Sequence, residues 1–204
     1  GTGIVFFNEF QIHPTGPWIG MGTGVAIVKD GETTATRVPD LLFRSPEADF
    51  THAAFVQEGT VYLYACDLGL CRIAKAPLTG ATERVNYTFW TGNAWSPNYA
   101  DASAPVPGSG AGFSVNWNPY LGQYVSFVSQ GISPTITMHV ANHPWGPWSA
   151  GTDVYTFPAG NTYAAGQHPA LDSADGKRIY VSAFDDLGNS DSAIVLFTVD
   201  LAKP

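Results

Sequence analysis

The feature that most constrains the fold of this chain is a repeated unit of short strands around a glycine turn. Each unit has one short strand, a tight turn, a second strand, a loop and a third strand. The turn glycines are Gly59, Gly122 and Gly176, which recur at intervals of 63 and 54 residues. Antiparallel repeats of about this period are typical of β-propellers, because a small sheet must be covered by its neighbours.

The repeat predicts an all-β fold in which short antiparallel sheets follow one another along the chain. First strands are expected at 53–57, 113–117 and 167–171, second strands at 59–65, 123–128 and 177–184, and third strands at 71–76, 136–141 and 193–199. A further unit is expected over 4–10, 22–28 and 36–43. We therefore predict a single β-propeller domain over residues 1–204 with about four blades. A β-sandwich with irregular hairpins is the alternative, and the repeat spacing favours the propeller.

The composition narrows the class of ligand. Among 204 residues, 9 Lys+Arg face 17 Asp+Glu, which gives a net charge of −8, and no basic cluster marks a nucleic-acid partner. No apolar run approaches the roughly 18 residues of a membrane-spanning helix, so no membrane partner is predicted. Aromatic residues make up 13% of the chain and charged residues also 13%. This balance fits an uncharged polar partner, such as a polysaccharide or oligosaccharide.

Polar residues on the predicted first strands form the candidate site, since the first strand of each propeller blade lines the central channel. These residues are Asn8, Glu9, Thr51, His52, Ser114, Asn116, Gln167 and His168. The amides and imidazoles are predicted to bind substrate hydroxyl groups, and Glu9, the only carboxylate, is predicted to be catalytic. Alternatives stay open: Glu9 fits a solvated edge position, His52 a strand cap, and His168 a hydrogen bond to backbone.

Tryptophans are the second candidate binding feature, because indole rings stack on the apolar faces of sugar rings. Trp90 and Trp95 flank a Thr-Gly-Asn loop and are predicted to bind substrate. Trp117 and Trp148 lie in strand-like or turn contexts, and we expect them to pack in the core.

The two cysteines indicate the compartment. Cys66 and Cys71 are separated by four residues and flanked by strand-like sequence, so a hairpin would place them within disulfide reach. A disulfide predicts a secreted protein, while a pair of reduced thiols is the alternative. Asn86 begins the only Asn-X-Thr sequon and is the predicted glycosylation site.

Several strings also resemble known families. Residues 143–149 (HPWGPWS) resemble the blade end of five-bladed glycosidase propellers, which include glycoside hydrolase family 43 and its relatives. Residues 89–95, 114–125 and 167–169 resemble a domain family long catalogued without a function, some members of which are secreted endo-D-arabinanases. The likeness runs through most of residues 20–201.

This resemblance implies a five-bladed fold, secretion, and hydrolysis of an arabinofuranosyl polysaccharide by a carboxylate pair at the channel mouth. Within the chain Asp49, Asp101 and Asp185 or Asp186, expected on loops, are all open as the second carboxylate. Family domains have about one further blade before this chain begins, and an essential acidic residue commonly sits on it. We therefore expect a missing N-terminal segment or a second chain as a partner.

The cofactor and the alternative functions follow from the same residues. His168 is a candidate for holding a channel ion or water, as central histidines do in the related propellers. No carboxylate cluster has calcium-loop spacing, so no cofactor is predicted, and a channel Ca²⁺ stays open. A non-catalytic carbohydrate-binding propeller or lectin is the alternative to an enzyme. A protein-interaction propeller is less favoured, because the chain is sparsely charged.

Overall fold

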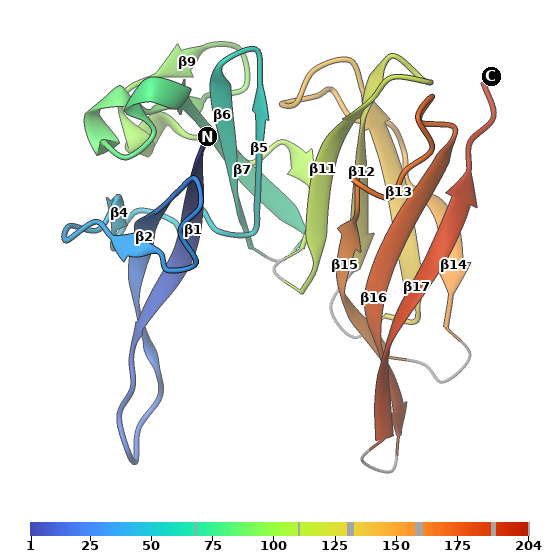
Figure 1. Ribbon diagram of the computed structural model, residues 1–204, viewed down its shortest axis with the longest axis horizontal. Helices are drawn as coiled ribbons and strands as arrows, with labels where there is room; N and C mark the ends of the chain where they lie inside the picture. Colours follow the sequence, from blue (N-terminus) through green and yellow to red (C-terminus); the bar gives the residue numbers. More distant parts are fainter. Residues whose placement is uncertain (68, 110, 130–132, 158–160, 189–190, 204) are drawn as a thin grey trace. The chain divides into compact units, whose positions relative to one another are not determined.

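The computed structural model describes residues 1–67, 69–109, 111–129, 133–157, 161–188 and 191–203. The chain divides into two compact units. The first unit contains Gly1–Ala65 and Arg72–Ser103, and the second contains Cys66–Cys71 and Ala104–Pro204. The described residues fold into four antiparallel sheets that use the strands in chain order (Figure 1). The prediction of an all-β fold is therefore confirmed. The sandwich alternative is wrong, because a sandwich would gather the strands into two sheets.

The first sheet is built on one long hairpin. Its strands are β1 (Thr2–Gln11), β2 (Ile19–Lys29), β3 (Thr36–Arg37) and β4 (Phe43–Arg44). β1 pairs with β2 from end to end, whereas β3 and β4 pair with β2 only through residues 22–27. The half of the hairpin nearer its turn therefore extends past the sheet as a two-stranded ribbon (Figure 1).

The continuous strand expected over 36–43 is wrong. Only its two ends pair, as β3 and β4, because Pro39 between them has no backbone N–H to donate to a ladder. The segment stays beside β2 through two isolated hydrogen bonds. Val38 N donates to Val25 O at 2.8 Å, and Leu42 N donates to Thr23 O at 2.8 Å.

The second sheet follows the predicted repeat. Its path is β5 (Ala53–Gln57), β6 (Thr60–Cys66), β7 (Leu70–Pro77), β8 (Thr88–Trp90) and β9 (Trp95–Ser96), with β10 (Val106–Pro107) paired to β7. Three short 3₁₀ helices lie between strands: η1 (Leu78–Gly80), η2 (Arg84–Asn86) and η3 (Tyr99–Asp101). Glu58 and Gly59 connect β5 to β6 with φ angles of 49° and 72°, the left-handed pair that a two-residue hairpin turn requires.

The third and fourth sheets form the second unit. The third contains β11 (Phe113–Asn118), β12 (Gln123–Ser129), β13 (Thr135–Ala141) and β14 (Thr152–Thr156). The fourth contains β15 (Asn161–Gln167), β16 (Arg178–Gly188) and β17 (Asp191–Asp200). Gly122 and Gly176 both have positive φ angles, 66° and 73°, as expected for the turn glycines.

The first strand of the fourth sheet lies earlier than expected. The expected strand at 167–171 is wrong, since β15 ends at Gln167 and the following residues form a turn. Pro169 cannot donate to a ladder, and Leu171 N donates instead to His168 O at 2.8 Å, which closes the turn. This difference places Gln167 at the end of the strand rather than at its beginning.

Each unit has its own hydrophobic core. In the first unit the rings of Phe43, Phe50, Tyr87 and Phe89 are fully buried and pack edge-on or tilted against one another. In the second unit Phe127 of β12 and Val181 of β16 belong to one buried cluster, so the third and fourth sheets face each other across it. No helix among the described residues is long and apolar enough to cross a membrane.

The buried Tyr87 makes the free energy of unfolding depend on pH. Its hydroxyl donates to Ala81 O at 2.7 Å, and burial raises the pKa of Tyr87 well above its usual value near 10. The unfolded chain therefore releases a proton above pH 10 that the folded chain retains. The free energy of unfolding should fall by about 1.4 kcal/mol per pH unit above pH 10 through this group alone.

Denaturant unfolding between pH 8 and pH 11.5 measures this slope. Tyr87→Phe should flatten it, at a cost of about 1 kcal/mol near neutral pH for the lost hydrogen bond. Tyr163→Phe is the control, because this phenol is 48% exposed, and it should leave the slope unchanged. An unchanged alkaline slope in Tyr87→Phe would contradict the assignment.

Candidate functional site

Two predicted site residues of the second unit meet between its sheets. Asn116 of β11 donates through Nδ2 to Gln167 Oε1 of β15 at 3.3 Å. Gln167 also donates through its backbone N to Ser114 Oγ at 3.0 Å. The first strands of two successive sheets are thus joined by polar side chains, as the sequence predicts for strands that line a common site.

Gln167 extends this network to a carboxylate that sequence reasoning missed. Its Nε2 donates to Asp172 Oδ2 at 2.6 Å, and Tyr180 N donates to Asp172 Oδ1 at 2.9 Å. Asp172 is part-buried and lies in the turn that follows β15. Its contacts are with Gln167 of β15 and Tyr180 of β16, and no sequence motif distinguishes it from other turn aspartates.

His168 and Gln167 point to opposite faces of the fourth sheet. Gln167 pairs with Val181, whose side chain is in the buried cluster, while His168 lies one residue further on. The His168 ring is exposed, and its Nε2 lies 2.8 Å from Ser182 Oγ. His168 therefore does not join the Asn116–Gln167–Asp172 network.

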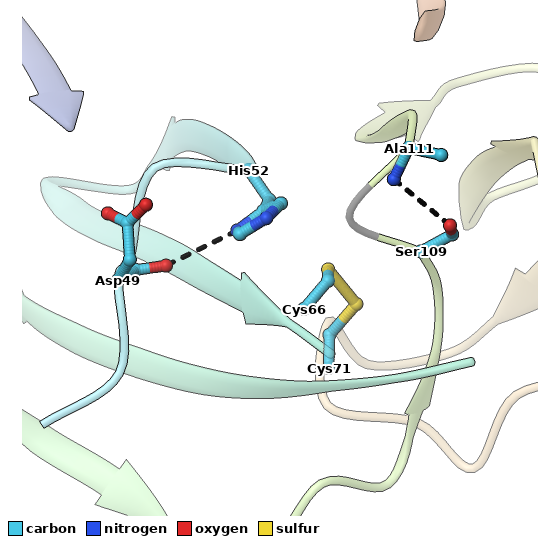
Figure 2. Close-up of a disulfide and its surroundings, with 6 residues drawn as sticks. All are labelled: Asp49, His52, Cys66, Cys71, Ser109 and Ala111. Carbon is cyan, nitrogen blue, oxygen red and sulfur yellow. Dashed lines mark hydrogen bonds between the residues drawn. A yellow bond between two sulfur atoms is a disulfide. The ribbon is translucent and has the colours of Figure 1, made fainter. Parts of the chain in front are cut away.

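The candidate site of the first unit is centred on Asp49, in the loop before β5. Thr23 Oγ1 donates to Asp49 Oδ1 at 3.1 Å, and Thr51 Oγ1 donates to the same carboxylate at 2.9 Å. Thr23 Oγ1 also accepts from Phe50 N at 2.9 Å, so the loop is fixed to β2. His52 Nδ1 lies 3.2 Å from the backbone oxygen of Asp49 (Figure 2).

Asn8 lies beside this loop and has an unused acceptor. It pairs directly with Thr23 across β1 and β2, so the two side chains share a face. The Oδ1 atom of Asn8 is inaccessible to solvent and accepts no hydrogen bond. A buried acceptor without a donor costs about 1–3 kcal/mol.

Glu9 points away from Asn8. Adjacent residues of a strand face opposite sides, and Glu9 pairs with Gly22 on the other face of the hairpin. The Glu9 carboxylate forms an ion pair with Arg37, whose guanidinium also lies 5.4 Å from the centre of the Phe7 ring. The Glu9 side chain is 30% exposed. Its catalytic role stays a prediction.

The other open carboxylates lie in different settings. Asp101, expected on a loop, is the last residue of η3 and accepts from Ser96 Oγ at 2.6 Å. The expectation that Asp185 and Asp186 lie on a loop is wrong, since both belong to β16, where they pair with Thr162 and Asn161. Asp185 is 5% exposed, and its Oδ1 has no hydrogen-bond partner. Among the residues that the structure describes, no three His, Cys, Asp or Glu side chains form a metal-binding group.

The tryptophans divide differently from the sequence expectation. Trp90 and Trp95 are half-buried and pair across the β8–β9 hairpin, with ring centres 5.3 Å apart. Lys75 Nζ lies 4.1 Å from the Trp95 ring centre, and burial lowers the pKa of Lys75. The expected core position of Trp117 is wrong, because its ring is 43% exposed. Trp148 is half-buried, with its Nε1 atom inaccessible and unpaired.

The predicted disulfide is present. Cys66 and Cys71 are bonded at the end of the β6–β7 hairpin, as Figure 2 shows. In the sequon, the Asn86 side chain donates through Nδ2 to Gly80 O at 3.1 Å and to Glu83 Oε2 at 3.3 Å. The nitrogen that would carry a glycan is therefore already a donor to the protein, and glycosylation at Asn86 stays a prediction.

Comparison with protein families places the chain in a family. Residues 8–186 match the model described as domain of unknown function DUF4185, and this match covers most of the chain. The chain therefore belongs to the DUF4185 family. A search of curated proteins found no match.

Comparison with solved structures identifies the fold. The crystal structure of a candidate hydrolase from Bacteroides ovatus matches with a TM-score of 0.65 and 16% identity, over 92% of this chain and 56% of that one. The α-L-arabinofuranosidase CtGH43 from Clostridium thermocellum matches with a TM-score of 0.64 and 12% identity, over 100% of this chain and 67% of that one. This chain thus spans about half to two thirds of their length. The predicted β-propeller fold is confirmed.

The Gln167 network generates a stability prediction. Gln167→Ala removes the partner of Asn116 Nδ2 and one partner of Asp172, and it should lower the free energy of unfolding by about 1–3 kcal/mol. Gln123→Ala is the matched control, since that amide donates to an exposed partner, Asn142, and its loss should cost under about 0.5 kcal/mol. Equal effects of the two variants in denaturant unfolding would contradict the network's role.

Proposed function

We propose that this chain forms part of a secreted glycoside hydrolase that acts on an arabinofuranosyl polysaccharide. The support comes from the fold, which it shares with an α-L-arabinofuranosidase, and from the ordered strings that resemble endo-D-arabinanases. The disulfide agrees with an oxidising compartment. The chain's sparse charge and its polar inner-strand side chains agree with a ligand that carries hydroxyl groups and no charge.

The observation that carries the proposal is the pairing of an unused acceptor with a positioned carboxylate in the first unit. Asn8 Oδ1 lacks a donor. Asp49 accepts a hydrogen bond from Thr23, the residue that pairs with Asn8 across the two strands. Sugar hydroxyl groups both donate and accept, so one hydroxyl can donate to Asn8 once its side chain turns outward, while another oxygen approaches Asp49. A wholly apolar ligand would leave Asn8 unsatisfied.

Glycoside cleavage requires two carboxyl groups, one to protonate the leaving oxygen and one to attack or to activate water. Asp49 lies with Asn8, whereas Glu9 lies on the opposite face with Arg37. We assign Asp49 as the carboxylate nearest the bound sugar. Glu9 faces the other side of the hairpin, so we leave the second carboxyl group of the pair unassigned.

Hydrolysis assays on the full-length protein test this function. D-arabinan and L-arabinan are incubated with the protein, and new reducing ends are counted. Asp49→Asn should lower kcat by about 10²–10⁴-fold, the usual contribution of a general acid or base. Asp40→Asn is the control, because that carboxylate is 91% exposed and pairs only with Arg44 at the surface.

Two results would contradict the assignment. Release of reducing ends from neither polymer by the wild-type protein would remove the proposed activity. Near-full activity of Asp49→Asn would remove the proposed residue while leaving the activity in place.

A non-catalytic carbohydrate-binding propeller is the second candidate function. The observation in its favour is that Asp49 and Asp172 already accept hydrogen bonds from the protein, which suits carboxylates that shape a binding surface. Binding of arabinan without any release of reducing ends would favour this candidate.

A further inference from the structure

An aromatic surface lies at the turn end of the β1–β2 hairpin. Its residues occupy other strand positions than Thr23, which bonds to the Asp49 loop. Trp18 is 65% exposed and Phe10 is 46% exposed, although both are large apolar side chains. Their ring centres are 6.1 Å apart, and the planes are tilted by 56°. The two rings therefore form one exposed surface, which we call the hairpin platform.

The backbone leaves the hairpin platform open. Gly20 pairs with Phe10, and a Cβ atom placed on Gly20 would lie 3.9 Å from the Phe10 ring. The Phe10 ring thus lies beside a strand position that has no side chain to cover it. No third strand pairs with this end of the ribbon among the described residues, because β3 and β4 reach only residues 22–27 of β2.

The turn that carries the platform is stiffened by its sequence. Pro14 and Pro17 lie within the five residues 13–17, and each proline fixes its own φ angle. A surface held by a restricted turn loses less conformational entropy when a ligand binds. Gln11, His13 and Thr15 belong to the same end of the hairpin and are exposed polar residues that can bond hydroxyl groups.

The lack of charged residues at this end of the hairpin indicates which kind of ligand the platform binds. No Asp, Glu, Lys or Arg occurs in residues 10–28. A lipid surface is disfavoured, because interfacial segments carry Lys or Arg for the headgroups and the chain's net charge is −8. A second copy is also disfavoured, because two chains of charge −8 repel each other. Neither objection applies to an uncharged polymer with apolar ring faces.

We propose that the hairpin platform binds a neutral polysaccharide chain by stacking sugar rings on Trp18 and Phe10. The inference rests on the proposed function, since the polymer is of the same class as the proposed substrate. The platform holds the polymer at a distance from the Asp49 loop, so it contributes to the binding of long chains and does not contact the bond that is cleaved.

Affinity gel electrophoresis of the full-length protein in soluble D-arabinan measures this binding without any need for catalysis. Trp18→Ala should weaken binding by about five- to tenfold, as expected for the loss of one stacking ring, and Trp18→Tyr should retain most of the affinity. Trp117→Ala is the matched control, since it removes another exposed indole outside the platform and should leave binding unchanged. Hydrolysis of a short arabino-oligosaccharide should be unchanged in Trp18→Ala.

The outcomes separate this inference from the proposed function. Arabinan binding that depends on Trp18 but comes with no hydrolysis by the wild-type protein would support the platform and contradict the enzyme. Hydrolysis with binding that is unchanged in Trp18→Ala would contradict the platform and leave the enzyme. Loss of a concentration-dependent dimer, or of binding to phosphatidylserine vesicles, in Trp18→Ala with unchanged arabinan binding would also overturn the inference.

Discussion

The second unit depends on the hydrogen bonds that Gln167 makes between two sheets. Through its side chain and backbone it contacts Asn116, Ser114 and Asp172 at once. Apolar packing behind this network fills the space between the sheets, yet apolar contacts alone do not fix which polar atoms face a ligand. A fully satisfied polar network does fix them, because each missing partner would leave a buried group unpaired.

In the first unit hydrogen bonds also hold polar side chains in position, but the oxygen of Asn8 stays unused. Thr23 is fully buried, and its hydroxyl both donates to Asp49 and accepts from Phe50 N, so the loop before β5 is held to β2. Asn8, across the strand pair from Thr23, keeps a buried oxygen without a donor. The two networks therefore differ: the hydrogen bonds around Gln167 pair the polar atoms that meet there, whereas Asn8 Oδ1 is buried without a donor.

Sequence reasoning predicted the sheets well because turn chemistry is local. Gly59, Gly122 and Gly176 all have the left-handed backbone that glycine tolerates best, so they mark the hairpins. The two wrongly predicted strands both contain a proline. Pro39 and Pro169 interrupt strands that the apolar pattern alone would have continued. The meeting of Asn116 with Gln167 was also predictable, because both lie on first strands of successive repeats.

The rest of the site was beyond the sequence for a geometric reason. Asn8 with Glu9, and Gln167 with His168, are adjacent residues that point to opposite faces, and pattern does not say which face a ligand meets. An NMR titration of the side-chain amides with arabino-oligosaccharide tests the central claim, that polar inner-strand side chains bind sugar. The account predicts shifts for Asn8, Asn116 and Gln167 and none for the exposed Asn142. Shifts confined to Asn142 and other surface amides would contradict it.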